Sequence, residues 1–476
     1  MAPGDSRRRR DQRHRQRHRA AEAARLHGLV KAVVERLPPD LHVQIHRRLD
    51  FLHRLAFASI CTASSGHVLR QEAPWLILPC TGQEEEEEEA KKQQVETSKV
   101  VSMADGRSAA FVRTAMRGHV IIGSSDGWLV TADDRAVLRM ANPATGAQAA
   151  LPTIYTIPFL YSLCAGQWFC LDLGPFVQIR FGGPPPEEDK DWGPHPPRSS
   201  TLTAPEMRER FYRKVVLSSS PRPGSYEAML LTHKHIGAPA FATSSDPNWR
   251  MARSPGGVED AIHHRGRFYS VTYAGDVEAW QRDAGSGEFT SRVVAPRLDC
   301  HHEASSVAEG SDRNKQQLRR KYLAVSTDGQ QLMAVLKHSE VVQAPGQYAY
   351  GRDKPKARVF FKVMVLAEAQ VVGNAAARWE KAADIGESAL FVGVNGTVCV
   401  STREHQGRIA AGCVYFTDDE VGVSNRYGYD VPDDTELREA GVYNLRTGKV
   451  ERIVEPDERR GEPHWPPPAW FTPSFL

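Results

Sequence analysis

The segment IGESALFVGVNGTVCVSTREHQGRIAAGCVYFTDDE, residues 385–420, decides which fold we expect for this chain. Apolar residues alternate along 390–394 and resume along 398–400, with Asn395-Gly396 between the two runs. Asn-Gly favours a tight hairpin, because both turn positions need a positive φ. After a glycine-containing loop, residues 414–416 form a third apolar run. The pattern predicts strand, turn, strand, long loop and strand, and an ordinary hairpin in any β protein stays open as the alternative.

Short apolar runs separated by glycine turns recur along the rest of the chain, most clearly at residues 109–151, 258–280, 322–336 and 441–453. Runs of about four β-branched or aromatic residues between such turns indicate antiparallel meanders. Four short strands need about 40–50 residues, so recurring meanders favour a mainly β fold, a β-propeller of about six or seven blades. Two stacked sandwich domains remain the rival interpretation.

Aromatic residues refine the expectation for the propeller. We expect Trp128, Trp249 and Trp280 to lie in the cores of the blades, where large aromatic side chains are usually buried. Residues 154–181 are unusually apolar and predict two inner strands. We expect loops at residues 80–108, 182–205, 300–318 and 343–357, where the glutamate run Glu84–Glu89, prolines or other polar residues dominate.

The N-terminal part of the chain has a different composition. Residues 1–20 carry eight arginines and two aspartates, a net charge of +6. The formal net charge of the whole chain is +3, so the rest of the chain carries −3. A like-charge block predicts a disordered tail, with nuclear localisation or RNA contact as its functional readings. The rest of the chain is not a basic nucleic-acid binder. Residues 21–73 predict a small helical domain, and residues 74–476 the propeller.

Composition also indicates the cellular compartment in which we expect the protein. The seven cysteines include no C-x-x-C pair, which favours free thiols in a reducing compartment, the cytoplasm or the nucleus. We expect no membrane contact, because no run of about 18 apolar residues is present. The basic N-terminus also lacks the apolar region of a secretory signal.

The helical region resembles the F-box, whose opening pattern is LPxDLxxxIxxRL. The matching residues are Leu37-Pro38, Asp40-Leu41, Ile45 and Arg48-Leu49, followed by Leu55, Phe57, Ile60 and Cys61. The resemblance implies that these helices bind the Skp-type adaptor of a cullin-RING ubiquitin ligase. The adaptor-binding residues it implies are Leu37, Pro38, Leu41, Ile45, Leu49, Leu55 and Ile60. The chain departs from the pattern at Ser64, where an F-box usually has Trp, so a propeller that no longer binds the adaptor is an alternative.

The whole chain resembles the plant KIB-type family, in which a degenerate F-box precedes a β-propeller. The resemblance rests on motifs spread in order along the chain: residues 74–79, 123–129, 142–146, 389–393, 412–419 and 470–474. It implies a non-enzymatic substrate-recognition subunit of an SCF-type ubiquitin ligase. The helices would bind the adaptor, and one face of the propeller would bind an unknown target protein.

Motifs of common enzymes are missing from the sequence. It contains no G-x-S-x-G, H-E-x-x-H or P-loop pattern. The ligand-like clusters are His263-His264 and Cys300-His301-His302-Glu303, but neighbours on a strand point to opposite faces and cannot chelate one ion. We therefore expect no metal, cofactor or catalytic residue, and a solvated turn at Asp418-Asp419-Glu420. A propeller hydrolase with catalytic groups from separate blades remains a second alternative.

Overall fold

The computed structural model describes residues 32, 36–49, 73–78, 97–103, 106, 108–112, 119–133, 135–143, 145–164, 167–172, 179, 199–204, 206–207, 211–233, 236–298, 315–342, 356–367, 377–403, 405, 409–417, 419, 440–453 and 468–474. The chain divides after Glu72 into two compact units, the second of which holds Ala73–Ser474. None of the helices in the described parts is long and apolar enough to cross a membrane.

In the first unit the structure describes helix α2 (Pro39–Arg48). The helix begins after Pro38, whose φ of −55° suits the entry, and Pro39 takes the first helical position, where a missing N–H costs nothing. Asp40 lies in the first turn, where a negative charge favours the helix dipole. Leu49 adopts an extended conformation and ends the helix.

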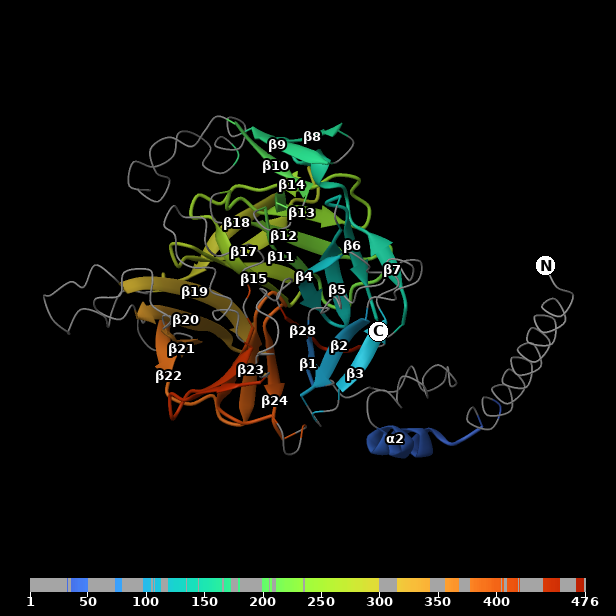
Figure 1. Cartoon of the computed structure of the whole chain (residues 1–476), viewed down its shortest axis with the longest axis vertical. Helices are drawn as coiled ribbons and strands as arrows, with labels where there is room; N and C mark the ends of the chain where they lie inside the picture. Colours follow the sequence, from blue (N-terminus) through green and yellow to red (C-terminus); the bar gives the residue numbers. More distant parts are fainter. Residues whose placement is uncertain are drawn as a thin grey trace, which may run out of the picture. The chain divides into compact units, whose positions relative to one another are not determined.

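The second unit is mainly β (Figure 1). Four of its sheets consist of four strands that are consecutive in the chain and antiparallel. Their strands are β4 (Val120–Ser125), β5 (Trp128–Ala132), β6 (Leu138–Ala141) and β7 (Gln148–Ala150); β11 (Tyr212–Leu217), β12 (Glu227–Thr232), β13 (Ala240–Thr243) and β14 (Arg250–Met251); β15 (Val258–His264), β16 (Arg267–Thr272), β17 (Val277–Arg282) and β18 (Phe289–Ala295); β19 (Lys315–Val325), β20 (Leu332–Val342), β21 (Lys356–Ala367) and β22 (Arg378–Ala382).

A fifth sheet joins the two ends of the second unit. Strand β28 (Ala469–Phe471) pairs with β1 (Trp75–Ile77), which is followed by β2 (Thr97–Ser102) and β3 (Ser108–Val112). A five-stranded sheet has the order β24-β23-β25-β26-β27, made of β23 (Ser388–Val392), β24 (Val398–Ser401), β25 (Cys413–Phe416), β26 (Gly441–Asn444) and β27 (Val450–Arg452). The last sheet has three strands, β8 (Leu160–Leu163), β9 (Trp168–Asp172) and β10 (Ser199–Thr203), and follows the 3₁₀ turn η2 (Ile154–Thr156).

Each sheet outside β8–β10 contacts the next one along the chain. Phe241 of β13 stacks on Phe289 of β18 with ring centroids 4.1 Å apart, in one apolar cluster shared by two sheets. Similar clusters join β15–β18 to β19–β22, and β19–β22 to the sheet of β23. Trp470 of β28 donates through Nε1 to the carbonyl of Val392, which joins the sheet of β23 to the sheet with both ends. The succession of packed antiparallel sheets is consistent with a β-propeller.

Strands β4 and β11 touch directly, although the sheet β8–β10 lies between them in the chain. A Cβ placed on Gly123 would lie 2.1 Å from the carbonyl oxygen of Val215, so only glycine permits this approach of the two strands. Tyr212 also donates through its hydroxyl to the carbonyl of Ala136, in the loop between β5 and β6. The sheet β8–β10 is therefore an insertion that the contact between its neighbours does not require, and Figure 1 shows it at the margin of the second unit.

The hairpin turns agree in part with the sequence prediction. Strands β23 and β24 pair as a hairpin, but neither Asn395 nor Gly396 has a positive φ, so the predicted tight Asn-Gly turn is wrong. Asn395 instead donates through Nδ2 to the carbonyl of Phe391, and the N–H of Gly396 donates to the carbonyl of Ser124 at 2.7 Å. Contacts within the loop and with β4 set the shape of this loop. Strand β25 then pairs with β23 in parallel, which the long intervening loop permits.

Several predicted loops and strands need correction. Residues 80–108 contain β2 and residues 182–205 contain β10, because short Thr-, Ser- and Val-containing runs form strands when a neighbouring strand supplies the hydrogen bonds. Strands β19 and β21 likewise begin inside 300–318 and 343–357. The apolar stretch 154–181 does not provide inner strands: it holds η2, β8 and β9 of the inserted sheet.

Candidate functional site

The predicted adaptor-binding residues lie around α2 in the first unit. Leu41 is 39% exposed, and Ile45 lies one turn further along the same face and is partly exposed. Pro38 is exposed at the helix entry, while Leu37 and Leu49 are partly exposed at the two ends. Leu55 and Ile60 lie outside the described residues. The described part thus presents apolar side chains on the surface of its own unit.

An aromatic patch marks the inserted sheet of the second unit. Of the large apolar side chains exposed among the described residues, four lie on η2, β8 and β9: Tyr155 (38% exposed), Tyr161 (50%), Leu163 (46%) and Trp168 (44%). Leu163 lies directly opposite Trp168 in the β8–β9 register. Exposed clusters of this kind are typical of interaction sites, and Trp and Tyr carry much of the binding energy of protein interfaces.

The same sheet has a buried face. Phe169 and Leu171 of β9 and Leu202 of β10 alternate with the exposed positions and are buried. Tyr155 stacks on Phe169 with ring centroids 5.7 Å apart, so it lies on the Phe169 side of the sheet and the outer patch consists of Tyr161, Leu163 and Trp168. Because side chains alternate between the two faces of a strand, packing of Phe169 and Leu171 fixes Tyr161, Leu163 and Trp168 on the outside. The buried face therefore fixes which side chains form the patch.

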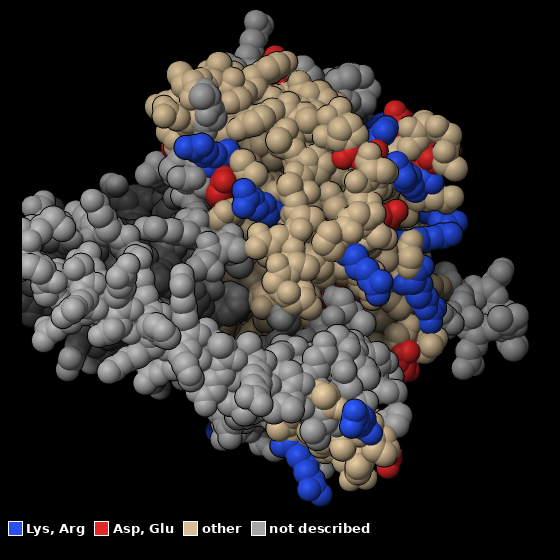
Figure 2. Space-filling view, turned by 90° about the vertical axis from the view of Figure 1, so that its right-hand side faces the viewer, with Lys and Arg blue, Asp and Glu red and all other residues tan. Residues whose placement is uncertain are grey.

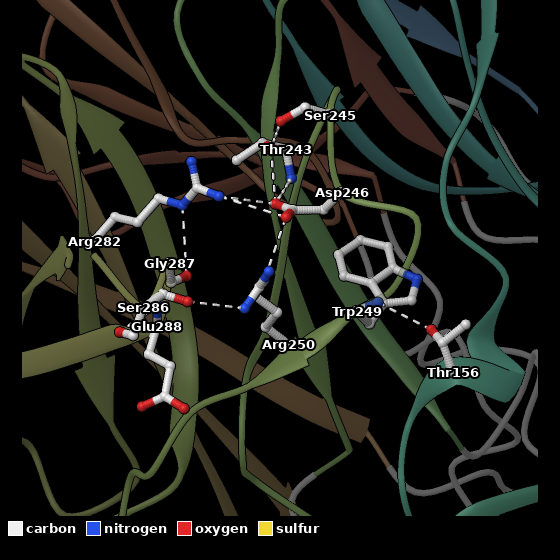
Figure 3. A network of polar contacts seen from close by, with 10 residues as sticks. All are labelled: Thr156, Thr243, Ser245, Asp246, Trp249, Arg250, Arg282, Ser286, Gly287 and Glu288. Carbon is white, nitrogen blue, oxygen red and sulfur yellow. Dashed lines mark hydrogen bonds and ion pairs between the residues drawn. The ribbon is translucent and has the colours of Figure 1, made fainter. Parts of the chain in front are cut away.

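The base of the insertion is held by the loop between β13 and β14 (Figure 3). Trp249, which is buried as predicted, donates its main-chain N–H to Thr156 Oγ1 at 2.9 Å and its indole N–H to the carbonyl of Pro152 at 2.8 Å. Trp128 and Trp280 are buried as well, which confirms the predicted role of the three tryptophans in the core.

Next to Trp249, one carboxylate holds two arginines of neighbouring sheets (Figure 3). Asp246 accepts from Arg250 Nε at 3.3 Å and from Arg282 Nη2 at 3.4 Å. Thr243 donates to the same carboxylate through its N–H and its hydroxyl. Burial alone would raise the pKa of Asp246, but the Thr243 donors and the two arginines outweigh it and lower the pKa. Arg250 also donates to the carbonyl of Ser286, so the network joins β13–β14 to the β17–β18 turn.

A second charged cluster lies buried where the first residues of β11 and β15 meet the middle of β19. Lys214 pairs with Asp260 at 2.5 Å, and Lys321 pairs with Glu259 at 2.5 Å, so β15 is joined to the strand on either side of it. Asp260 accepts in addition from the main-chain N–H of Leu323 at 2.8 Å. Burial raises the pKa of both carboxyl groups, while the lysines oppose the rise.

Asp419 belongs to the same cluster. Its carboxylate lies 3.7 Å from Arg213 on one side and 3.7 Å from Arg320 on the other. The predicted solvated turn at Asp418-Asp419-Glu420 is therefore wrong at Asp419, which is buried. Burial alone would lower the pKa of Arg213, but Tyr273 and Asp419 raise it well above its ordinary value. A buried carboxylate next to two guanidinium groups costs less free energy than an unpaired one.

The cluster bears on the hydrolase alternative, because it brings carboxyl groups from separate strands together. Glu259 and Asp260 each face a lysine at hydrogen-bond distance, and Asp419 faces two arginines. Carboxylates engaged in this way join β11, β15 and β19, which gives them a structural role.

The predicted weakness of the histidine pair as a metal site stays a prediction. His263 accepts through Nδ1 from the N–H of Ser219 at 3.0 Å. Burial lowers the pKa of His263, although Asp126 opposes the shift. Among the described residues, no group of three or more His, Cys, Asp or Glu side chains is placed to hold a metal ion. The cluster Cys300-His301-His302-Glu303 lies outside them.

Sequence reasoning missed the two features that stand out in the second unit. The aromatic patch was hidden because its apolar residues suggested inner strands. The alternation of Tyr161 and Leu163, and of Trp168 with Phe169 and Leu171, was the available signal. The ion pairs Lys214–Asp260 and Lys321–Glu259 involve residues 46 and 62 positions apart, and no local pattern announces them.

Comparisons with known proteins place this chain. It is 25% identical to an F-box protein from Arabidopsis thaliana over 257 residues, 52% of this chain and 53% of the relative, so the match spans about half the length of that protein. Among solved structures, the β-propeller domain of Cps50 (Swd1) from Myceliophteria thermophila has a TM-score of 0.25 at 10% identity, over 71% of this chain and 87% of that one. A putative 6-phosphogluconolactonase from Bacteroides uniformis has a TM-score of 0.21 at 13% identity, over 66% and 95%. Likenesses this distant carry no argument.

The family model described as KIB1-4 beta-propeller matches residues 100–444, most of the second unit. Because this match covers more than half of the sequence, the chain belongs to the KIB1-4 beta-propeller family.

Proposed function

We propose that this protein is a non-enzymatic substrate-recognition subunit of an SCF-type cullin-RING ubiquitin ligase. Residues 21–73 act as an F-box-like domain that binds a Skp-type adaptor, and the second unit binds the protein to be ubiquitylated. Six sheets of that unit serve as propeller blades, and the sheet β8–β10 is an insertion between two of them. The protein works in the cytoplasm or the nucleus, and the arginine-rich residues 1–20 are the one part suited to contact nucleic acid.

One observation carries the adaptor part of the proposal: α2 holds apolar residues of the F-box pattern at its surface. Leu41 is 39% exposed on a helix of which Asp40, Gln44 and Arg48 are also exposed. Exposing a leucine on a short polar helix gains nothing for the helix itself, so a partner surface explains the residue. Membership of a propeller family and the similarity to a plant F-box protein support the same assignment.

The adaptor part is tested by mixing the purified full chain with a purified Skp-type adaptor and measuring the dissociation constant by calorimetry. We expect Leu41→Gln, which keeps the helix but removes the apolar side chain, to weaken binding roughly tenfold or more, as for a hot-spot residue. Gln44→Ala on the same helix is the matched control and should leave the dissociation constant unchanged.

If the wild-type chain does not bind the adaptor, the ligase assignment is wrong. Ser64, in the place of the usual Trp, would then account for the loss of binding. The protein is then an interaction propeller that has lost adaptor binding. If Leu41→Gln and Gln44→Ala bind equally well, the adaptor contacts another surface, and the assignment of α2 is wrong even though the function stands.

A further inference from the structure

We propose that the open edge of β8 and the outer face of the sheet β8–β10 form a docking site for an extended, uncharged segment of a partner protein, which adds to the sheet as a fourth strand. The inference rests on the proposed function, because it names the part of the second unit that contacts the target. It goes further by stating the shape and the chemistry of the segment that is recognised.

The first argument is the main-chain geometry of β8. Just before the strand, the carbonyl of Phe159 accepts from the N–H of Asp172 at 2.8 Å, and Tyr161 and Leu163 then face Cys170 and Trp168. Hydrogen-bonded pairs alternate along an antiparallel ladder, so Tyr161 and Leu163 bond to β9. The N–H and the C=O of Ser162 therefore point to the opposite side of β8.

That side of β8 is open among the described residues. The sheet has the order β10-β9-β8, and no further described strand pairs with β8. The sheets that follow one another along the second unit have four or five strands, whereas this one has three. An edge strand with unpaired N–H and C=O groups is a template for an added strand, the recognition mode known as β-augmentation.

The second argument is the side chains around the edge. Tyr161, Leu163 and Trp168 share the outer face, and each is at least 44% exposed. Ser162 on the opposite face is exposed too, so β8 projects beyond the apolar cluster beneath the sheet. An added strand would lay every second side chain beside Tyr161 and Leu163. Two aromatic rings next to an open edge provide contacts beyond the main-chain hydrogen bonds.

The third argument is charge complementarity. Seven described residues of the outer face are uncharged: Tyr161, Leu163, Trp168, Cys170, Ser199, Thr201 and Thr203. The one charged residue among the described residues of this face, Asp172, lies at the last position of β9, opposite Ser199 and at the far end of the strand from Trp168. A charged side chain docked on them would lose water without gaining a partner, which costs free energy. Figure 2 shows the charged side chains of one side of the molecule gathered mainly at its flanks. The segment therefore carries apolar or aromatic residues at alternate positions.

The peptide used to test the proposal is selected from a random library. Displayed random octapeptides are panned against the immobilised full chain, and the dissociation constants of the enriched peptides are measured by fluorescence anisotropy. We expect the peptides to be uncharged, with apolar residues at every second position. Each enriched peptide is then methylated on its main-chain nitrogens, once at the odd positions and once at the even positions. One of the two methylated forms should bind about tenfold more weakly and the other almost as well as the parent peptide, because a strand turns only half of its N–H groups towards β8.

Three variants of the full chain complete the experiment. Ser162→Pro removes the N–H on the open edge but keeps the bonds of Tyr161 and Leu163 to β9, and it should weaken the peptide roughly tenfold, the size of one strong interface residue. Trp168→Ser removes the aromatic contact and should act similarly. Val293→Ser, at an apolar residue that is 61% exposed on β18, is the matched control and should bind like wild type. Thermal unfolding confirms that all variants fold.

Each remaining outcome overturns the proposal. Enriched peptides that are charged, or that bind Ser162→Pro as well as wild type, contradict recognition at the edge. Panning that yields no peptide preferring wild type over Trp168→Ser contradicts a role for the patch. If sedimentation shows a dimer that Trp168→Ser makes monomeric, the occupant is a second copy of the chain. None of these results depends on adaptor binding, so a failure here and a failure of the proposed ligase function are distinguishable.

Discussion

Single residues decide how neighbouring sheets are joined, and Asp246 is the clearest case. We expect Asp246→Asn to reduce the free energy of unfolding by about 1–3 kcal/mol at neutral pH, because Arg250, Arg282 and Thr243 lose a charged acceptor. Urea unfolding of the full chain measures the change. Glu288→Gln, which neutralises an exposed carboxylate close by, should stay within about 0.5 kcal/mol of wild type.

The stability that the Asp246 carboxylate contributes depends on pH. The pKa of Asp246 is lowered on folding, so the stability it contributes is present above the pKa of the unfolded chain and disappears as pH falls through the lower folded pKa. The difference between wild type and Asp246→Asn should therefore shrink below about pH 4, the ordinary range of an aspartate. A difference that is constant from pH 7 to pH 3 would show that the charge of Asp246 is not what stabilises the network.

At the residue scale, the sequence identified core tryptophans but not charge partners. Trp128, Trp249 and Trp280 followed from the general rule that large aromatic residues are buried. Asp419 had the same local appearance as any acidic turn at the end of a strand. Its burial depends on Arg213 and Arg320, which lie about 100 to 200 residues away in the chain and were not recognisable as partners.

At the scale of elements, the β4–β5 hairpin links the strand ladder to the C-terminal segment. Its turn residues Asp126 and Gly127 have φ values of 44° and 83°, the left-handed region that a two-residue hairpin turn requires. A Cβ on Gly127 would lie 2.5 Å from Cβ of Ser474. The turn therefore needs glycine twice, for its backbone conformation and for the close approach of residue 474.

Two glycines separate these requirements experimentally. Gly146 has a φ of 74°, but a Cβ added to it would have no other atom within 4 Å, so Gly146→Ala imposes only the backbone strain. Gly127→Ala adds the steric clash and should cost about 1–3 kcal/mol more in the free energy of unfolding, the usual penalty of overpacking. Thermal and urea unfolding of both variants measure the difference, and equal losses would mean that residue 474 does not rest on the turn.

Turns were predicted correctly where neighbouring residues alone determine their shape, and wrongly where a strand distant in the sequence contacts them. The tight turns at Asp126-Gly127 and Arg265-Gly266 have the left-handed φ values that their glycines suggested. The Asn395-Gly396 turn differs because Gly396 donates to Ser124 of β4, a contact that no window of sequence contains. The inserted sheet was misplaced for the same reason: apolar composition predicts strands but does not say which sheet they join.

At the scale of the whole second unit, the sheet of β28 and β1 holds its two ends together. Trp470 is buried, donates to the carbonyl of Val392 and meets the ring of Phe391 edge-on at 5.0 Å. We expect Trp470→Ala to lower the free energy of unfolding by about 3–5 kcal/mol, as for other buried tryptophans. Trp168→Ala, at a tryptophan that is 44% exposed, is the control and should cost far less. Equal unfolding midpoints for the two variants would contradict a closing role for β28.

The general architecture was within reach of the sequence, because a repeated pattern of short strands and turns reports the mainly β fold many times over. The resemblance of the whole chain then led to the correct family. The docking surface was not within reach in the same way. It depends on one open edge and on which face of β8 is buried, and both are properties of the assembled sheet.

The pairing of β28 with β1 also constrains how a cell can make this protein. Trp75 is translated almost 400 residues before its partner Phe471, a delay of about 20–80 s at ordinary elongation rates. Throughout that interval, the nascent chain carries β1 without its final neighbour. Its edge and the apolar residues around Leu76 are then sites for chaperone binding or for aggregation. Heat applied during the last stage of synthesis should therefore reduce the yield of folded protein more than the same heat applied after release. Slow codons near the 3′ end of the message, which lengthen the interval, should lower the yield as well.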